Sequence, residues 1–220
     1  MKYKCLVFDH DDTTVNSTAN IHYPSFIEFM KIYRPNLKIS LEDYVRFNFD
    51  PGVIPFFRDI CGLSEKEMMD EQNFWMDFSS KRVSDAFPGI RDLMLKHKEQ
   101  GGIIAVVSHS FNSNILRDYE HNDLPTPDLI FGWEQPKEER KPSPIPLYKI
   151  MEKYNLKPED LLVIDDLKPG LDMARAAGVE FAAAGWCFSI PENVKYMQEN
   201  ADYYFKSVQE LIDHYNKSAL

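Results

Sequence analysis

Short runs of apolar residues that end in a polar residue recur along the chain. Residues 3–8, 102–107 and 161–165 have this form. Apolar strands without alternation are typical of a parallel sheet that is covered on both faces. The pattern therefore predicts buried parallel strands, each of which delivers a polar side chain where it ends.

Segments whose apolar residues have helical spacing lie between these runs and after them. In "FPGIRDLMLKHKEQGG", residues 87–102, apolar positions recur every three or four residues, and Gly101 stands where the helix would end. The segment "PIPLYKIMEKYNL" repeats this spacing with Leu147, Ile150 and Tyr154. Alternating strands and helices predict an α/β fold with a three-layer, Rossmann-like parallel sheet core.

Residues 16–83 interrupt the alternation. They contain "FIEFMKIY", "VIPFFRDICGL" and "EQNFWMDFSS", which are aromatic and helical in pattern, and no good strand. We therefore predict an α-helical cap domain at 16–83, inserted into a core domain made of 1–15 and 84–220. Most of its aromatic side chains are expected to pack the cap itself. A dimer face would use similar residues, so the oligomeric state stays unknown.

Composition narrows the class of partner. Of the 220 residues, 35 are Asp or Glu and 25 are Lys or Arg, which gives a formal charge of −10 and disfavours a nucleic-acid partner. No apolar run approaches the ~20 residues of a membrane helix, so we expect no membrane partner. The three cysteines form no CxxC pair and are read as reduced thiols. The default expectation is a cytoplasmic protein.

The segment "KCLVFDHDDTTVNS", residues 4–17, concentrates carboxylates after the first strand. Asp9, Asp11 and Asp12 lie within four residues. Close carboxylates raise one another's pKa unless a cation or hydrogen-bond donors compensate. This part of the sequence therefore predicts a bound positive charge.

Other segments add polar residues at the same edge of the sheet, because ligands of open α/β sheets bind beyond the carboxyl ends of the strands. Ser108 and His109 follow one strand, and Asp165 and Asp166 end another. Lys141 lies in "RKPSP", where the following proline favours an extended loop. A nucleophilic carboxylate, an acid/base and donors for phosphate oxygens indicate phosphoryl transfer. Oxygen ligands without clustered His or Cys favour Mg²⁺ over Zn²⁺.

Together these segments resemble the haloacid dehalogenase superfamily of phosphohydrolases, in the branch with an inserted helical cap. "FDHDDTTVNS", "VVSHS", "RKPSPIPLYKIMEKY" and "LLVIDDLKPGLDMARAAG" are similar to its four motifs, in order. The resemblance extends from residue 3 to about 216. It implies a Mg²⁺-dependent phosphatase that hydrolyses a small phosphorylated metabolite, with a phosphoglycolate-phosphatase-like activity as the default.

The resemblance also implies roles for individual residues. Asp9 would attack phosphorus and become an aspartyl-phosphate, and Asp11 would act as the acid/base. Lys141 would neutralise developing charge, Ser108 would hydrogen-bond a phosphate oxygen, and Thr13 would support the turn after the nucleophile.

The metal ligands implied by the resemblance are the Asp9 carboxylate, the Asp11 backbone carbonyl and Asp166. Two positions depart from the family pattern. Asp12 stands where the family usually has Gly, and Gly170 falls where a second acid often sits. Asp165, and after it Asp172, are the acids expected to compensate for Gly170.

Several alternatives stay open. The first is a sugar-phosphate mutase, because such relatives carry a cap histidine near the position of His22, although a lone histidine is more often structural. The second is a non-catalytic phosphometabolite-binding protein, which Asp12 and Gly170 would support. His109 is read either as a substrate contact through its backbone N–H or as a packed loop residue. Dehalogenation is disfavoured, and a plain turn and N-cap cluster is the simplest alternative for Asp9 and Asp11.

Overall fold

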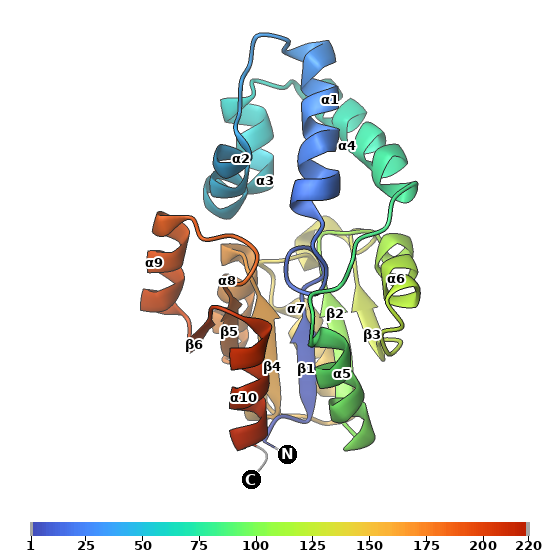
Figure 1. Ribbon diagram of the computed structural model, residues 1–220, viewed down its shortest axis with the longest axis vertical. Coiled ribbons are helices and arrows are strands. Elements are labelled where there is room, and N and C mark those ends of the chain that lie inside the picture. Colours follow the sequence, from blue (N-terminus) through green and yellow to red (C-terminus); the bar gives the residue numbers. More distant parts are fainter. Residues whose placement is uncertain (1, 219–220) are drawn as a thin grey trace.

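In the computed structural model, which describes residues 2–218, six strands form one parallel sheet (Figure 1). The strand order is β3-β2-β1-β4-β5-β6, and every neighbouring pair is parallel. The predicted parallel sheet is confirmed. β1, β2 and β4 lie in the three predicted runs, and β6 lies in "ADYYFKSVQELIDHY", residues 201–215, whose pattern predicts a last strand and a closing helix. The sequence did not predict β3 and β5. The strands are β1 (Cys5–Phe8), β2 (Ile103–Val107), β3 (Leu129–Phe131), β4 (Leu161–Asp165), β5 (Glu180–Ala184) and β6 (Tyr203–Phe205).

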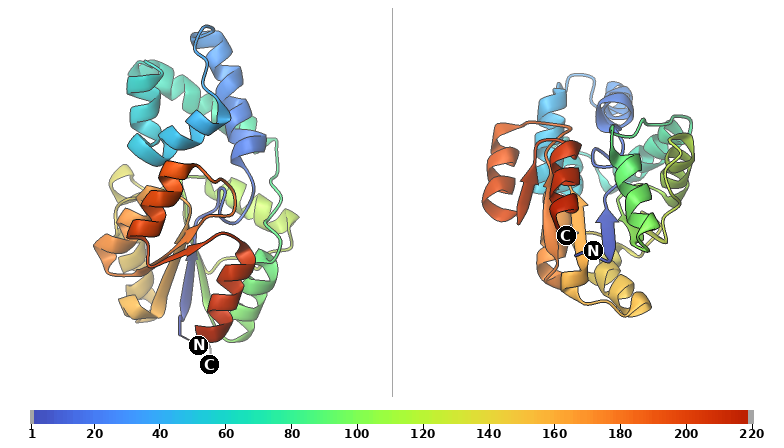
Figure 2. Two further views of the ribbon diagram at one scale, coloured as in Figure 1. Left: turned by 60° about the vertical axis from the view of Figure 1, so that its left-hand side comes forward. Right: turned by 60° about the horizontal axis from the view of Figure 1, so that its bottom comes forward.

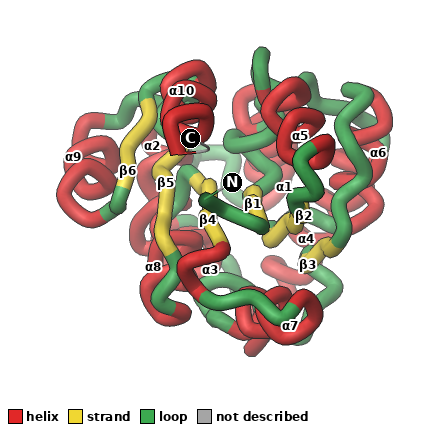
Figure 3. Tube along the Cα trace, turned by 90° about the horizontal axis from the view of Figure 1, so that it is seen from below, coloured by secondary structure: helices red, strands yellow, loops and turns green. Residues whose placement is uncertain are grey.

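Helices cover both faces of this sheet. Leu6 and Phe8 of β1 join one buried cluster, and Cys5 and Val7 join the cluster on the other face. Figure 3 shows α5 and α10 on one side of the sheet and α7 and α8 on the other. The predicted three-layer core is confirmed. The first cluster is built with α5 (Ile90–Glu99), α6 (Asn112–His121) and α10 (Val208–Ser218), and the second with α7 (Ile145–Tyr154), α8 (Lys168–Ala177) and α9 (Pro191–Asn200).

Strand register brings the candidate residues to one edge. Phe8 lies opposite both Val106 of β2 and Ile164 of β4. The next residues are Asp9, which directly follows β1, and Asp165, which is the last residue of β4. They lie at the same level of the sheet, and their carboxylates come together.

The inserted segment is helical, as predicted, and lies beyond this edge of the sheet (Figure 2). Within the described chain it contains no strand from residue 18 to residue 80. The exact domain boundaries, 16 and 83, stay a prediction. The elements are η1 (Thr18–His22), α1 (Tyr23–Tyr33), α2 (Leu41–Phe47), η2 (Asn48–Gly52), α3 (Val53–Pro55), η3 (Phe56–Ile60) and α4 (Glu65–Ser80); two short 3-10 turns in the core are η4 (Lys137–Glu139) and η5 (Pro158–Asp160).

Most aromatic side chains of the cap pack within it, as expected. They form a third buried cluster that includes Phe26, Phe29, Tyr44, Phe56 and Phe57. Phe49 is different, because it belongs to the cluster of the core and packs edge-on against Tyr196, with ring centroids 5.6 Å apart. Phe49 therefore fixes the cap to the core by apolar contact.

Local sequence signals set the helix ends that position the site. Ser64 and Glu67 form a reciprocal capping box that begins α4. Gly101 follows the end of α5 with a φ of +79°, a left-handed conformation that favours glycine. None of the described helices is long and apolar enough to cross a bilayer.

Candidate active site

Asp9 and Lys141 form the centre of the site. Asp9 directly follows β1, and both side chains are buried. Lys141 Nζ lies 2.9 Å from Asp9 Oδ1 and 2.6 Å from Asp165 Oδ2. The contact with Asp9 lies outside hydrogen-bond geometry, so Asp9 Oδ1 has no hydrogen-bond partner among the described residues. Burial lowers the pKa of Lys141, but the carboxylates of Asp165 and Asp9 raise it by more, so the ammonium group stays charged.

Three carboxylates gather beside this lysine, and two of them contact it. Asp9, Asp165 and Asp166 each offer an oxygen, and these atoms lie within 4.8 Å of one another. Burial, together with repulsion by Asp9, raises the pKa of Asp165 to about 7 despite Lys141. Burial and the neighbouring acids raise the pKa of Asp166 well above its usual value. The all-oxygen donor set, the excess of acids over the one lysine and Asp9 Oδ1, which accepts no hydrogen bond, fit a hard divalent cation such as Mg²⁺.

Gly170 explains how Asp165 enters this group. A Cβ at position 170 would lie under 3.0 Å from the carboxyl atoms of Asp165. Asp165 therefore fills the space that a larger residue 170 would occupy, and its Oδ1 accepts the Leu167 N–H at 2.8 Å. Asp172, the other candidate, instead pairs with Lys168. The structure thus brings Asp165, and not Asp172, to the acidic group.

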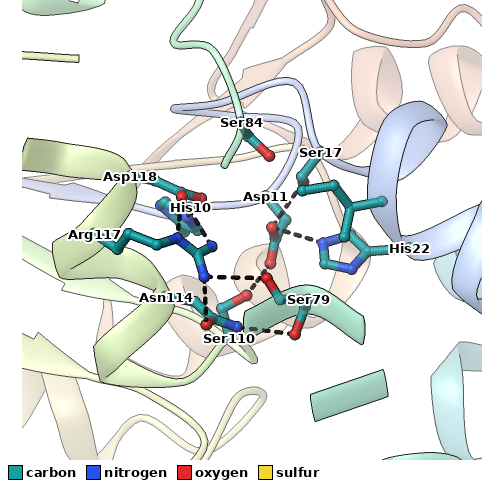
Figure 4. A pocket seen from close by; sticks show the side chains of 11 residues that line it. His10, Asp11, Ser17, His22, Ser79, Ser84, Ser110, Asn114, Arg117 and Asp118 are labelled. Atoms are coloured by element: carbon teal, nitrogen blue, oxygen red, sulfur yellow. Dashed lines mark hydrogen bonds and ion pairs between the residues drawn. The ribbon is translucent and has the colours of Figure 1, made fainter. Parts of the chain in front are cut away.

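Asp11 is surrounded by donors from both the cap and the core. Its Oδ1 accepts hydrogen bonds from Ser17 Oγ at 2.7 Å and His22 Nε2 at 2.8 Å, and Oδ2 accepts one from Ser110 Oγ (Figure 4). Burial raises the pKa of Asp11. The hydrogen-bond donors around it, His22 first, lower this pKa by more, so the net pKa lies well below its usual value. Asp11 is therefore ionised in this arrangement. The sequence placed Ser110 after the second strand, beside Ser108 and His109, but assigned no role to Ser110 or Ser17.

His22 is held between Asp11 and a tryptophan of α4. Trp75 Nε1 donates a hydrogen bond to His22 Nδ1 at 2.8 Å. An indole N–H can only donate, so Nδ1 is an acceptor and the single ring proton lies on Nε2, facing Asp11. Burial lowers the pKa of His22 and Asp11 raises it by more, which by itself would favour the charged ring. An imidazolium, however, would carry a second N–H at Nδ1, pointing at the N–H of Trp75. We therefore assign the neutral ring.

The purely structural interpretation of His22 is thus incomplete, because the ring contacts the candidate acid/base. No sequence signal links Trp75 to His22, since 53 residues separate them. Trp75 also stacks on Phe111 of the core, with ring centroids 5.4 Å apart. The Trp75–His22–Asp11 chain therefore connects the cap to the carboxyl edge of the sheet.

The remaining predicted residues lie around this group. Thr13 Oγ1 donates to Asp166 Oδ1 at 3.1 Å. Ser108 is buried at the end of β2, and its Oγ accepts the Ser110 N–H at 3.1 Å. The ring of His109 lies 3.2 Å from the Lys141 carbonyl through Nε2, and burial lowers its pKa to about 4. The His109 side chain is thus neutral and packed against the loop that carries Lys141.

Asp12 adopts the turn conformation that the family pattern assigns to glycine. Its φ is +58°, in the left-handed region that Asp tolerates better than most residues. The buried carboxylate accepts the backbone N–H groups of Ser17 at 3.3 Å and Thr18 at 3.0 Å. Asp12 therefore organises the start of the cap.

A polar clamp holds the end of α4 on the core. The Arg117 guanidinium of α6 donates to the carbonyls of Ser79 and Ser80, both at 3.0 Å, and to Asp118. Figure 4 shows Arg117 between Asp118 and Ser79. Asp118 in turn contacts Nε2 of His10, the residue that follows Asp9, at 3.2 Å. These contacts fix where the cap meets the first strand.

The first strand of the parallel sheet is followed by two acids, and a buried lysine and a further pair of acids lie on other segments of the same edge. This is an α/β protein with an inserted helical cap and a candidate ligand site at the carboxyl edge of its sheet. The model of the haloacid dehalogenase-like hydrolases matches residues 6–184. The chain belongs to this family.

Individual relatives are distant but cover nearly the whole chain. A phosphoglycolate phosphatase of Haemophilus influenzae is 25% identical over 223 residues, covering 96% of this chain and 97% of the relative. The pyrophosphatase PpaX of Bacillus cereus is 23% identical over 186 residues, covering 84% and 85%. Among solved structures, a haloacid dehalogenase-like hydrolase from Bacteroides fragilis has a TM-score of 0.79 at 21% identity, covering 96% and 100%. This last likeness shows the shared fold.

Proposed function

We propose that the protein is a Mg²⁺-dependent phosphatase that hydrolyses a small phosphorylated metabolite through an aspartyl-phosphate on Asp9. The observation that carries the proposal is the burial of Asp9 beside Lys141 and two further acids, with Asp11 two residues away. Membership of a hydrolase family and relatives named as phosphatases support it.

In the first half-reaction, an Asp9 carboxylate oxygen attacks phosphorus as the bond from phosphorus to the leaving oxygen breaks. Asp11 gives its proton to that oxygen, so it must take up a proton when substrate binds. Lys141 and Ser108 stabilise charge on the phosphoryl oxygens. The product is an aspartyl-phosphate and a free alcohol.

In the second half-reaction, water attacks the phosphorus and Asp11 accepts its proton. The bond between Asp9 and phosphorus breaks, which releases phosphate and restores the carboxylate. The ionised Asp11 of this structure suits this step.

The divalent cation would balance the charge of the acids and of the phosphate. Asp9, Asp166 and the Asp11 carbonyl would hold it, and Thr13 would orient Asp166. Both oxygens of Asp165 already accept hydrogen bonds, from Lys141 and from the Leu167 N–H. Asp165 would therefore complete the negative site while it positions Lys141.

The test is release of phosphate from a panel of small phosphate esters, with Mg²⁺ and with EDTA. Asp9→Asn removes the nucleophile, and Asp172→Asn is a matched control because Asp172 pairs with Lys168 away from the acid group. We expect Mg²⁺-dependent release that Asp9→Asn abolishes and Asp172→Asn leaves intact. Full activity in Asp9→Asn would disprove the proposal.

A sugar-phosphate mutase is the second candidate, because His22 contacts Asp11. A structure from Bacteroides vulgatus assigned as a β-phosphoglucomutase has a TM-score of 0.74 at 22% identity, covering 99% of this chain and 89% of that one. Interconversion of hexose 1-phosphate and 6-phosphate without net phosphate release would favour this reading. Release without interconversion would exclude it.

The sequence support for a non-catalytic binding protein is weaker in the structure. Asp12 keeps the left-handed turn, and the space at Gly170 is filled by Asp165. The two differences from the family pattern, at residues 12 and 170, therefore do not remove a functional group from the site. Tight phosphate binding without turnover at ample Mg²⁺ is the result that would favour this alternative.

A further inference from the structure

Glu71 is an acid of the cap on the side of α4 that faces the site. It precedes Trp75 by one helical turn, so the two side chains share a face of α4. Trp75 donates to His22, and His22 donates to Asp11. Burial raises the pKa of the Tyr44 phenol, and the nearby acids Glu71, Asp12 and Asp11 raise it further. Glu71 therefore lies on the face of α4 that carries Trp75, one helical turn along from the hydrogen-bonded chain Trp75–His22–Asp11.

The Glu71 carboxyl has no hydrogen-bond or ion-pair partner among residues 2–218, although it is partly buried. Acids removed from water are normally paired, because an unpaired charge is costly to desolvate. Burial raises the pKa of Glu71 to about 7, and only His22 opposes this rise. A carboxyl kept without a partner at this place is available to a ligand.

The buried lysine of the site, Arg117 and the arginines of the cap are all paired with other groups. Lys141 is the only lysine or arginine that is buried among the described residues, and it contacts Asp9 and Asp165. Arg117, near Asp11, donates to Asp118 and to carbonyls at the end of α4. The cap arginines bond to an acid or a backbone carbonyl of the cap, namely Arg34 to Glu67, Arg46 to Glu42, Arg58 to Asp59 and Arg82 to Phe78.

We propose that Glu71 selects a leaving group that is uncharged or cationic and carries a hydrogen-bond donor, such as a hydroxyl or an amine. The inference rests on the proposed phosphatase function and narrows its substrate class. A leaving group with its own carboxylate or phosphate would meet Glu71 without a compensating cation. The substrate is thus of a different charge type from phosphoglycolate and pyrophosphate, the compounds that the names of the relatives mention.

The experiment compares three phosphate esters whose leaving groups have two carbons and differ in charge. They are 2-hydroxyethyl phosphate, 2-aminoethyl phosphate and phosphoglycolate, and kcat/KM is measured for each with Mg²⁺ at pH 8. We expect the full-length protein to favour the hydroxyl or amine ester over phosphoglycolate by at least about tenfold. In Glu71→Gln this preference should fall by about tenfold, mainly through a lower KM for phosphoglycolate.

Glu65→Gln is the matched control, because it makes the same change of charge at an exposed position of the same helix. It should leave the preference unchanged. Equal or better hydrolysis of phosphoglycolate by the wild-type protein, or the same preference in Glu71→Gln, would overturn the leaving-group inference alone. No phosphate release from these esters or from p-nitrophenyl phosphate would overturn the phosphatase proposal and this inference with it.

Discussion

Asp165 and Gly170 share one space. The Asp165 carboxyl lies where the side chain of residue 170 would begin, under 3.0 Å from a Cβ built there. Lys141 is bound to that carboxyl at 2.6 Å. The absence of a side chain at residue 170 is therefore what allows Asp165 to hold the lysine.

This relationship predicts an unusual sign for Gly170→Ala. Within a helix such as α8, replacing glycine with alanine normally stabilises by roughly 0.5–1 kcal/mol. Here the methyl group would displace Asp165, and overpacking of this kind costs about 1–3 kcal/mol. We expect a lower melting temperature and about a tenfold higher Mg²⁺ concentration for half-maximal activity.

Thermal unfolding and a Mg²⁺ titration of phosphate release measure these two effects. Ala176→Gly, at an exposed position of the same helix, should destabilise by about 1 kcal/mol through helix propensity alone and leave the titration unchanged. A Gly170→Ala protein that is more stable and binds Mg²⁺ normally would contradict the steric argument.

Trp75→Phe tests whether the indole N–H positions His22. Phenylalanine keeps an aromatic ring against Phe111 but removes the donor to His22 Nδ1. The His22 ring is then free to change tautomer, so we expect kcat to fall roughly three- to tenfold with little change in KM. Steady-state kinetics of Trp75→Phe, His22→Ala and the double variant separate the effects. If Trp75 acts through His22, Trp75→Phe has no further effect in the His22→Ala protein, whereas additive losses would argue for independent roles.

Asp166→Asn should stabilise the protein in the absence of metal. Burial and the nearby acids raise the pKa of Asp166, so its charged form is unfavourable in the folded state. The neutral amide removes this repulsion and, with it, one of the proposed metal ligands. In thermal unfolding with EDTA we expect Asp166→Asn to melt above the wild type. Added Mg²⁺ should stabilise the wild type by about 2.7 kcal/mol at 100 times Kd, and the variant far less. Equal Mg²⁺ stabilisation of both proteins would remove Asp166 from the ligand set.

Glu71 makes the stability of the protein dependent on pH. Its pKa is raised from 4.5 to about 7, so between these pH values the folded protein holds a proton that the unfolded chain has released. Stability therefore falls as pH rises through this window. Glu71→Gln lacks this loss, and at pH 8 it should be more stable than the wild type by up to roughly 3 kcal/mol, with no difference near pH 4. Urea unfolding at both pH values measures this, with Glu65→Gln as the control. A constant difference across pH would show that Glu71 does not titrate as described.

The sequence by itself determined the architecture and the chemical character of the site. The apolar run Leu161–Asp165 and the helical spacing around Leu147 are local patterns that can be read from the sequence. Because their apolar side chains must be buried away from water, few arrangements of these strands and helices are possible. Because parallel strands end at one edge, the sequence also indicated that Asp9 and Lys141 would meet, and the structure places them 2.9 Å apart.

Only the tertiary structure decided which acid compensates for Gly170 and what surrounds Asp11. The choice of Asp165 over Asp172 depends on the space beside a helix, which residue types and spacing do not encode. The contact of Trp75 with His22 depends on how α4 packs over η1. Such contacts join residues far apart in sequence, so they are set by packing of the whole domain and not by any local preference.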